Sequence, residues 1–218
     1  MADQLYLSLW FPTFRFAALP EKLVCVLNHF ARVSGMPDAT RVTAAAAYPI
    51  GFSESPSYQR LFVHDDRSEE TPDALIENAV AEATEQLHED MAYEFEMRWL
   101  LWSPVLDDTP EDPEAGLDIV WRQTPTTVRI LGFGPQFDDA SFDQNGHIRI
   151  DFGLDTPWVL EDAELDEQTT LYIQKNIEML LAFTLSVEKH CATSSRLLWT
   201  ESGEPLVQKL IDRLQRVH

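Results

Sequence analysis

The feature that most limits how this chain can fold is a change of hydrophobic period at Asp90. Before it, apolar residues recur at helical spacing from Leu75 to Leu87. After it, apolar and charged residues alternate from Tyr93 to Leu101. A period of 3.6 predicts an amphipathic helix, and a period of two predicts a strand with one buried face. We therefore expect a helix followed by a strand, with one sheet face formed by Tyr93, Phe95, Met97, Trp99 and Leu101.

Similar patterns upstream complete a recognisable order of elements. Residues 5–11 alternate as a strand does, Pro20 opens a helical stripe, and residues 41–48 and 58–64 are interpreted as two further strands. Four consecutive alanines, at 44–47, weaken the first of those two predictions. Thr71 precedes a proline and an acid, which is typical of a capped helix start. The order strand, helix, strand, strand, helix, strand predicts a ferredoxin-like unit over residues 1–104.

The second half of the chain predicts a strand-rich unit that ends in helices. Residues 105–116 are acidic and carry two prolines, as an exposed linker or loop does. Residues 117–218 predict antiparallel strands plus two helices, with a turn at Thr124-Pro125. The first helix, 169–190, is apolar around most of its circumference and is expected to be buried on more than one side. The fold class is therefore α+β, either as two units or as one continuous core.

The formal net charge of −21 is concentrated in particular regions. Residues 65–114 hold 17 acids against two bases. A field of this sign repels nucleic-acid phosphates and anionic lipid headgroups, and it attracts basic proteins. The sequence therefore predicts a basic protein partner, no nucleic acid and no membrane. The alternative is that the acidity serves solubility or adaptation to salt or acid.

The termini and the cysteines indicate a cytoplasmic protein. The first residues carry an acid instead of the basic segment of a signal peptide, and no apolar run is long enough to cross a bilayer. Cys25 and Cys191 form neither a disulfide framework nor a CxxC pair, so we expect both thiols to be reduced, within helices.

Searches for known catalytic chemistry find little. The chain has no GxGxxG, GxxxxGK[ST], HExxH or GxSxG motif, and its eight glycines offer little backbone for phosphate binding. Asp151 and Asp155 follow a strand, where catalytic carboxylates are often found. Cys25 and His29 lie one helical turn apart, but no third ligand accompanies them at a suitable spacing. We expect no cofactor and no metal, and an enzymatic role is the less favoured one.

The leading hypothesis is a protein-binding or inhibitory module that engages a basic partner, such as an immunity protein that neutralises a nuclease-like toxin. Its partner-binding candidates are acids on one helix face and two tryptophans placed opposite the regular apolar face of their strands: Glu82, Glu85, Glu89, Trp10 and Trp102. The alternatives are an enzyme with a carboxylate-based site and a self-associating structural subunit, so a homo-oligomer stays open.

Overall fold

The computed structural model describes residues 2–34, 42–62, 71–106, 119–138, 141–159 and 166–203. The described strands are β1 (Gln4–Trp10), β2 (Ala44–Pro49), β3 (Tyr58–Leu61), β4 (Met91–Leu106), β5 (Ile119–Phe133), β6 (Ile148–Leu154) and β7 (Ser195–Thr200). The described α-helices are α1 (Leu19–Ser34), α2 (Pro72–Ala83), α3 (Ser141–Gln144), α4 (Thr156–Val159) and α5 (Glu167–His190).

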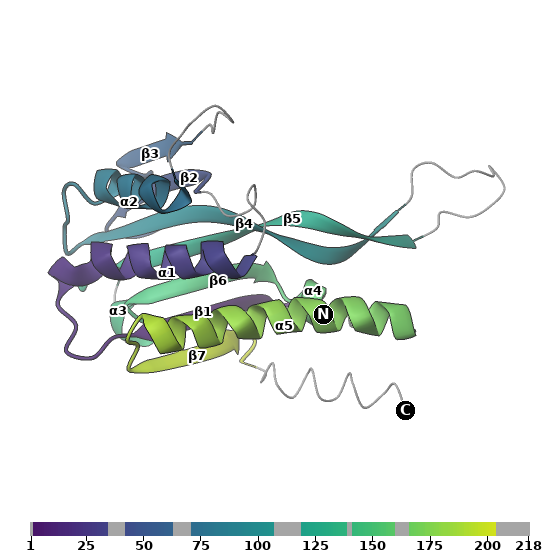
Figure 1. The fold of residues 1–218 in the computed structure, drawn as a ribbon. Helices are drawn as coiled ribbons and strands as arrows, with labels where there is room; N and C mark the ends of the chain where they lie inside the picture. The colour runs from purple at the N-terminus through teal and green to yellow at the C-terminus, as the bar shows by residue number, and fades with distance from the viewer. Residues whose placement is uncertain are drawn as a thin grey trace.

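The seven strands form one antiparallel sheet in the order β3-β2-β4-β5-β6-β1-β7 (Figure 1). The sheet contains strands from both halves of the sequence. Its longest pairing joins β4 to β5, from Ala92 opposite Phe133 to Leu106 opposite Ile119. The expected α+β class is therefore confirmed as a mixed fold built on a single sheet.

The sheet order differs from that of a ferredoxin-like unit. In such a unit the first strand would pair with strands of the same half, whereas here β1 pairs with β6 and β7. The reason is that each strand has only two edges. Both edges of β4 are occupied, one by β2 and the other by β5 along its full length. β2 takes the first part of one edge, from Met91 to Glu96, and β1 joins the sheet through strands of the second half.

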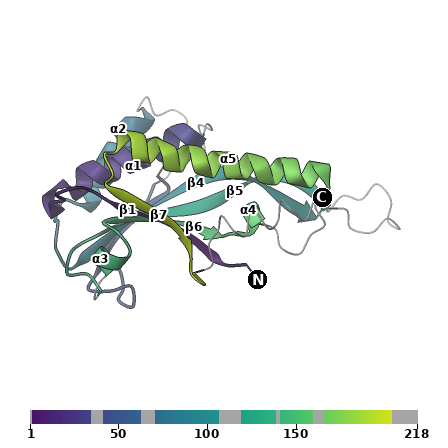
Figure 2. The ribbon, with the colours of Figure 1, turned by 90° about the horizontal axis from the view of Figure 1, so that it is seen from below.

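The main core lies between the sheet and the helices α1, α2 and α5, which cover one face (Figure 2). The predicted alternation in β4 is confirmed, because its five apolar positions are all buried on this face: Tyr93, Phe95, Met97, Trp99 and Leu101. On the same face of the sheet, beyond β5 and β6, β1 contributes a row of three leucines that are fully buried. The change of period at Asp90 therefore does mark the change from helix to strand.

Two helices differ in detail from the sequence prediction. The Thr71 hydroxyl accepts a hydrogen bond from the backbone N–H of Ala74, as a cap does, but α2 ends at Ala83 and not near residue 87. Thr84 ends the helix by donating its hydroxyl to the Val80 carbonyl. The expectation that α5 is buried on several sides is wrong, because Leu181 and Leu185 are exposed on its outer face.

The second half of the chain also differs from its sequence prediction. The predicted turn at Thr124-Pro125 is wrong, because both residues lie inside β5, opposite Leu101 and Leu100. Proline is tolerated there since β5 pairs over this stretch with β4 only. The predicted acidic linker falls almost entirely outside the described residues, apart from 105 and 106, which belong to β4. The predicted last helix, from residue 204 onward, also lies outside them.

Candidate functional site

The face of the sheet opposite α1, α2 and α5 carries the side chains that alternate with the core. No described helix of similar length covers it (Figure 2). The strand registers align charged and aromatic positions across it, from the β3 edge to the β7 edge. They are Gln59, Tyr48, Glu94, Glu96, Arg129, Arg149, Asp151, Tyr6 and Trp199.

A hollow of about 310 Å³ opens on this face over β2, β3, β4 and β5. Ala44 and Ala46 of β2 point toward it, since they pair with Glu96 and Glu94 of β4. Their small side chains leave space where longer ones would fill it. We call this depression the alanine-floored hollow; its walls are Tyr48, Gln59, Leu61, Glu94, Glu96 and Arg129. The alanines that weaken the strand pattern in the sequence are thus what shapes the hollow.

Most charged side chains around the hollow have a partner. Arg129 donates from Nε to Glu96 Oε1 at 3.3 Å. Asp151 Oδ1 accepts hydrogen bonds from the Gln4 side chain at 2.7 Å and from the Gly153 backbone at 2.9 Å.

Arg149 lies between two rings, with its guanidinium carbon 5.3 Å from the centre of Tyr6 and 5.2 Å from that of Phe133. Such stacking stabilises a cation that has lost part of its water shell. Burial lowers the pKa of Arg149, which is a sign of the same loss of water. The centre of this face is therefore a partly desolvated polar patch.

Glu94 is the exception among these carboxylates. Its side chain is half-buried, and the described part of the chain contains no hydrogen bond or ion pair to its carboxylate. Burial raises the pKa of Glu94; Glu96 and Asp151 act in the same direction, while Arg129 and Arg149 oppose it. Two arginines against three carboxylates leave one negative charge in excess when Glu94 is ionised.

The residues singled out from the sequence as partner-binding are not gathered in one place. Glu82 and Glu85 do line a common hollow of about 360 Å³, together with Tyr58 and His88. Glu82 is engaged there by an ion pair with Arg60, whereas no hydrogen bond or ion pair of the Glu85 side chain occurs within the described residues. Glu85 follows the end of α2, so the two acids do not share a helix face.

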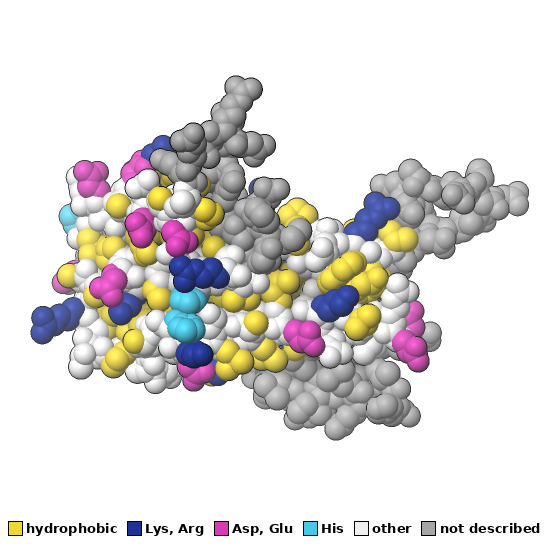
Figure 3. All heavy atoms as spheres, in the orientation of Figure 1, with side chains coloured by type: hydrophobic (Ala, Val, Ile, Leu, Met, Phe, Trp, Pro, Cys, Tyr) yellow, Lys and Arg dark blue, Asp and Glu magenta, His cyan; other side chains and the backbone are white. Residues whose placement is uncertain are grey.

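The other three candidates lie on separate elements. Glu89 Oε2 accepts a hydrogen bond from Gln136 Nε2 at 2.6 Å. Trp10, at the end of β1, is half-buried and donates from Nε1 to the carbonyl of Asp143 at 3.3 Å. Trp102 stacks on Tyr172 of α5, with 4.2 Å between ring centres. Acids on the helix-covered face are likewise scattered (Figure 3).

Asp151 and Asp155, the carboxylate pair noted in the sequence, both form hydrogen bonds with residues at the start of the chain. Asp155 is buried and accepts a hydrogen bond from the Asp3 backbone N–H at 2.9 Å. Its own backbone N–H donates to the Asp3 carbonyl at 2.7 Å. Asp151 and Asp155 therefore hold the N-terminal end of β1 against the end of β6.

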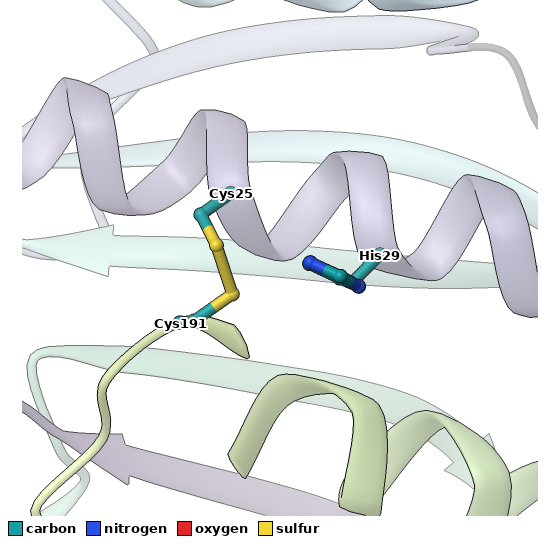
Figure 4. Close-up of side chains that lie close together, drawn as sticks. All are labelled: Cys25, His29 and Cys191. Atoms are coloured by element: carbon teal, nitrogen blue, oxygen red, sulfur yellow. A yellow bond between two sulfur atoms is a disulfide. The ribbon is translucent and has the colours of Figure 1, made fainter. Parts of the chain in front are cut away.

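The expectation of two reduced cysteines is wrong. A disulfide joins Cys25 of α1 to Cys191, the residue that caps α5, with 5.9 Å between their Cα atoms (Figure 4). The two helices pack side by side, so cysteines 166 residues apart in sequence come into bonding distance. His29, one turn after Cys25, lies beside this disulfide, and its ring stacks on His190 at 5.0 Å.

No protein-family model matches the chain, and no curated protein or solved structure shows significant similarity to it. Among the described helices, none is long and apolar enough to span a membrane. Inference about function therefore rests on the sites themselves.

Sequence reasoning missed Glu94 as a site residue, although a signal was present. Glu94 and Glu96 are visible as the polar side of an alternating strand. The sequence does not show which strand lies beside these two residues. That strand is β2, and its small alanine side chains leave the space that forms the hollow.

Proposed function

We propose that the protein is a binding module that receives a basic side chain of a partner protein in the alanine-floored hollow. The observation that carries this proposal is Glu94, a half-buried carboxylate in an open hollow without a counter-charge bound to it among the described residues. Removing a carboxylate from water without a bonded partner costs free energy. A lysine or arginine from a partner would offset that cost.

The lining of the hollow suits such a side chain. Long basic side chains place an apolar stem on apolar surface and keep the charged head near polar groups. Ala44, Ala46 and Leu61 offer the apolar surface, and Glu94 and Glu96 the acceptors. The volume of about 310 Å³ is at the lower end of ligand pockets, which favours one side chain over a larger ligand.

The acidity of the whole chain supports the same proposal at longer range. A net charge of −21 steers a basic protein toward the surface before contact is made. An inhibitory, immunity-like role against a basic nuclease is one form of this proposal, and a cytoplasmic location is the setting we propose for it.

An enzyme with a carboxylate-based site is the second candidate, because Glu94 has a raised pKa beside a second carboxylate, Glu96. Such a pairing is what general acid–base catalysis requires. The described residues that line the hollow, however, include no serine, threonine, cysteine, histidine or lysine, so such an enzyme would depend on Glu94, Glu96 and Tyr48 alone. Binding is therefore the better supported of the two functions.

Calorimetric titration with a short blocked peptide that contains lysine and arginine tests the proposal. We expect Glu94→Gln to weaken binding by about tenfold or more, because hydrogen bonds to charged groups contribute about 1.5–3 kcal/mol. Glu77→Gln, which removes the same charge from an exposed position on α2, is the matched control and should bind almost as the wild type does.

A second peptide, with acetylated lysine and with citrulline in place of arginine, keeps the shape and removes the charge. It should fail to bind. Equal weakening by Glu94→Gln and Glu77→Gln would show that only the general field of the protein attracts cations, and the proposal would then be wrong.

A further inference from the structure

The junction of α1 and α5 places metal-binding side chains together on the helix-covered face. The candidate ligand atoms of Cys25, His29 and Cys191 all lie within 4.8 Å of one another. Cys191 is almost fully buried, and Cys25 and His29 are half-buried. Figure 4 shows the distal ring nitrogen of His29 pointing toward the two sulfur atoms. The sequence pair Cys25 and His29 thus has the third ligand that spacing alone did not reveal.

We propose that Cys25, Cys191 and His29 form a zinc site that is available only when the disulfide is reduced. Two thiolates and one imidazole are ligands that zinc prefers, and three protein ligands leave a fourth position for water. Both sulfurs can bind one tetrahedral zinc when they separate to about 3.8 Å, which follows from zinc–sulfur distances of about 2.3 Å. The disulfide and the zinc site are then two alternative states of one pair.

A dithiol reductant supplies the electrons and protons that are needed to open the disulfide. The dithiol gives two electrons and two protons to the Cys25–Cys191 bond and becomes a disulfide itself, leaving two protein thiols. Zinc binding then displaces one proton from each thiol and forms two zinc–sulfur bonds. Oxidation of the dithiolate by another disulfide reverses the sequence and releases the metal.

The surroundings of His29 prepare it to act as a ligand. Its Nδ1 lies 2.8 Å from the hydroxyl oxygen of Ser186, and this contact holds the ring in place. Holding one ring nitrogen in a hydrogen bond leaves the other for a metal.

A switchable pair also agrees with the proposed cytoplasmic location. Disulfides in that compartment are usually transient, catalytic or redox-sensing. A permanent bond is expected in an oxidising compartment instead. The inference does not depend on the alanine-floored hollow, which lies on the opposite face of the sheet.

Cobalt(II), a spectroscopic substitute for zinc, tests the inference in the full chain. The chain is reduced with a phosphine, desalted without oxygen and titrated with cobalt. We expect one cobalt per reduced chain, with thiolate charge-transfer bands and tetrahedral visible bands, and none per oxidised chain. His29→Ala should weaken the affinity by more than about tenfold. His88→Ala, in the segment between α2 and β4 and outside this cluster, is the control and should bind as the wild type does.

Thermal unfolding gives a second measurement that remains valid if reduction loosens the fold. Zinc should raise the melting temperature of the reduced chain and leave that of the oxidised chain unchanged. A reduced chain that gains no stability from zinc and binds no cobalt would overturn the inference. So would a His29→Ala variant that binds cobalt as tightly as the wild type, because the metal would then be held without this ligand.

Discussion

Asn176, in the middle of α5, forms hydrogen bonds with both backbone groups of Trp102 on β4. Its Oδ1 accepts from the Trp102 N–H at 2.9 Å, and its Nδ2 donates to the Trp102 carbonyl at 2.8 Å. A third bond reaches the carbonyl of Pro157. Because β2 pairs with β4 only from Met91 to Glu96, no described strand lies beside the later part of that edge. The Asn176 amide takes the place of the missing strand at Trp102.

Replacing Asn176 with alanine should therefore destabilise the protein. The variant leaves buried backbone groups without partners, and each such group costs about 1–3 kcal/mol. We expect the free energy of unfolding in urea to fall by at least about 2 kcal/mol. Gln174→Ala, on the exposed side of the same helix, should change it by no more than about 0.5 kcal/mol. Equal stability of the two variants would contradict the role assigned to Asn176.

Reduction of the Cys25–Cys191 disulfide should lower stability in the absence of metal. The bond closes a loop with a sequence separation of 166, and removing a native disulfide typically costs about 2–5 kcal/mol. Urea unfolding with a chelator present should show a loss in that range when reductant is added. A Cys25→Ala/Cys191→Ala variant should be indifferent to the reductant. A wild-type chain that is equally stable with and without reductant would argue against the disulfide.

Reversal of the acids around the end of α2 tests electrostatic steering. We expect lysine at positions 82, 85 and 89 to slow association with a basic peptide much more than it speeds dissociation. Stopped-flow measurements over a range of salt should show the difference shrinking as salt rises, because screening acts over about 8–10 Å. Reversal at position 82 also breaks the exposed ion pair with Arg60, which contributes little to stability because water screens it. An unchanged association rate would contradict electrostatic steering by these acids.

Stability should depend on pH through Glu94. Its folded pKa is raised above the ordinary value of 4.5, so the folded state holds its proton more tightly than the unfolded chain does. This contribution to stability is fully present below pH 4.5 and is lost as pH rises through the folded pKa. Glu94→Gln should therefore be more stable than the wild type at neutral pH, by up to about 1 kcal/mol, and nearly equal to it in acid. Lower stability of the variant at neutral pH would contradict a desolvated carboxylate.

The sequence predicts the parts of this fold that depend on local pattern. The alternation from Tyr93 to Leu101 and the cap at Thr71 are both confirmed, because period and capping act within a few residues. The sheet order could not be predicted in the same way. It depends on which strand edges remain free after β4 and β5 have paired, and this is a competition between distant segments.

Neither the alanine-floored hollow nor the cysteine cluster could be predicted from the sequence, and the reason is the same for both. Ala46 and Glu94 are 48 residues apart and face each other only through the register of β2 on β4. Cys25 and Cys191 meet only because α1 packs beside α5. Their residue types were visible in the sequence, and their neighbours were not.

The pKa of Glu94 in the free and peptide-bound protein is the most direct test of the proposed function. Carbon NMR of its carboxyl group, followed over pH, reports this value for the one residue. A cation bound in the alanine-floored hollow should lower the pKa of Glu94, because a nearby positive charge favours the ionised form. The carboxyl signal of Glu77, on α2, should not respond to the peptide and serves as the internal reference. If saturating lysine- and arginine-containing peptide leaves the Glu94 pKa raised and unchanged, the hollow does not receive a basic side chain.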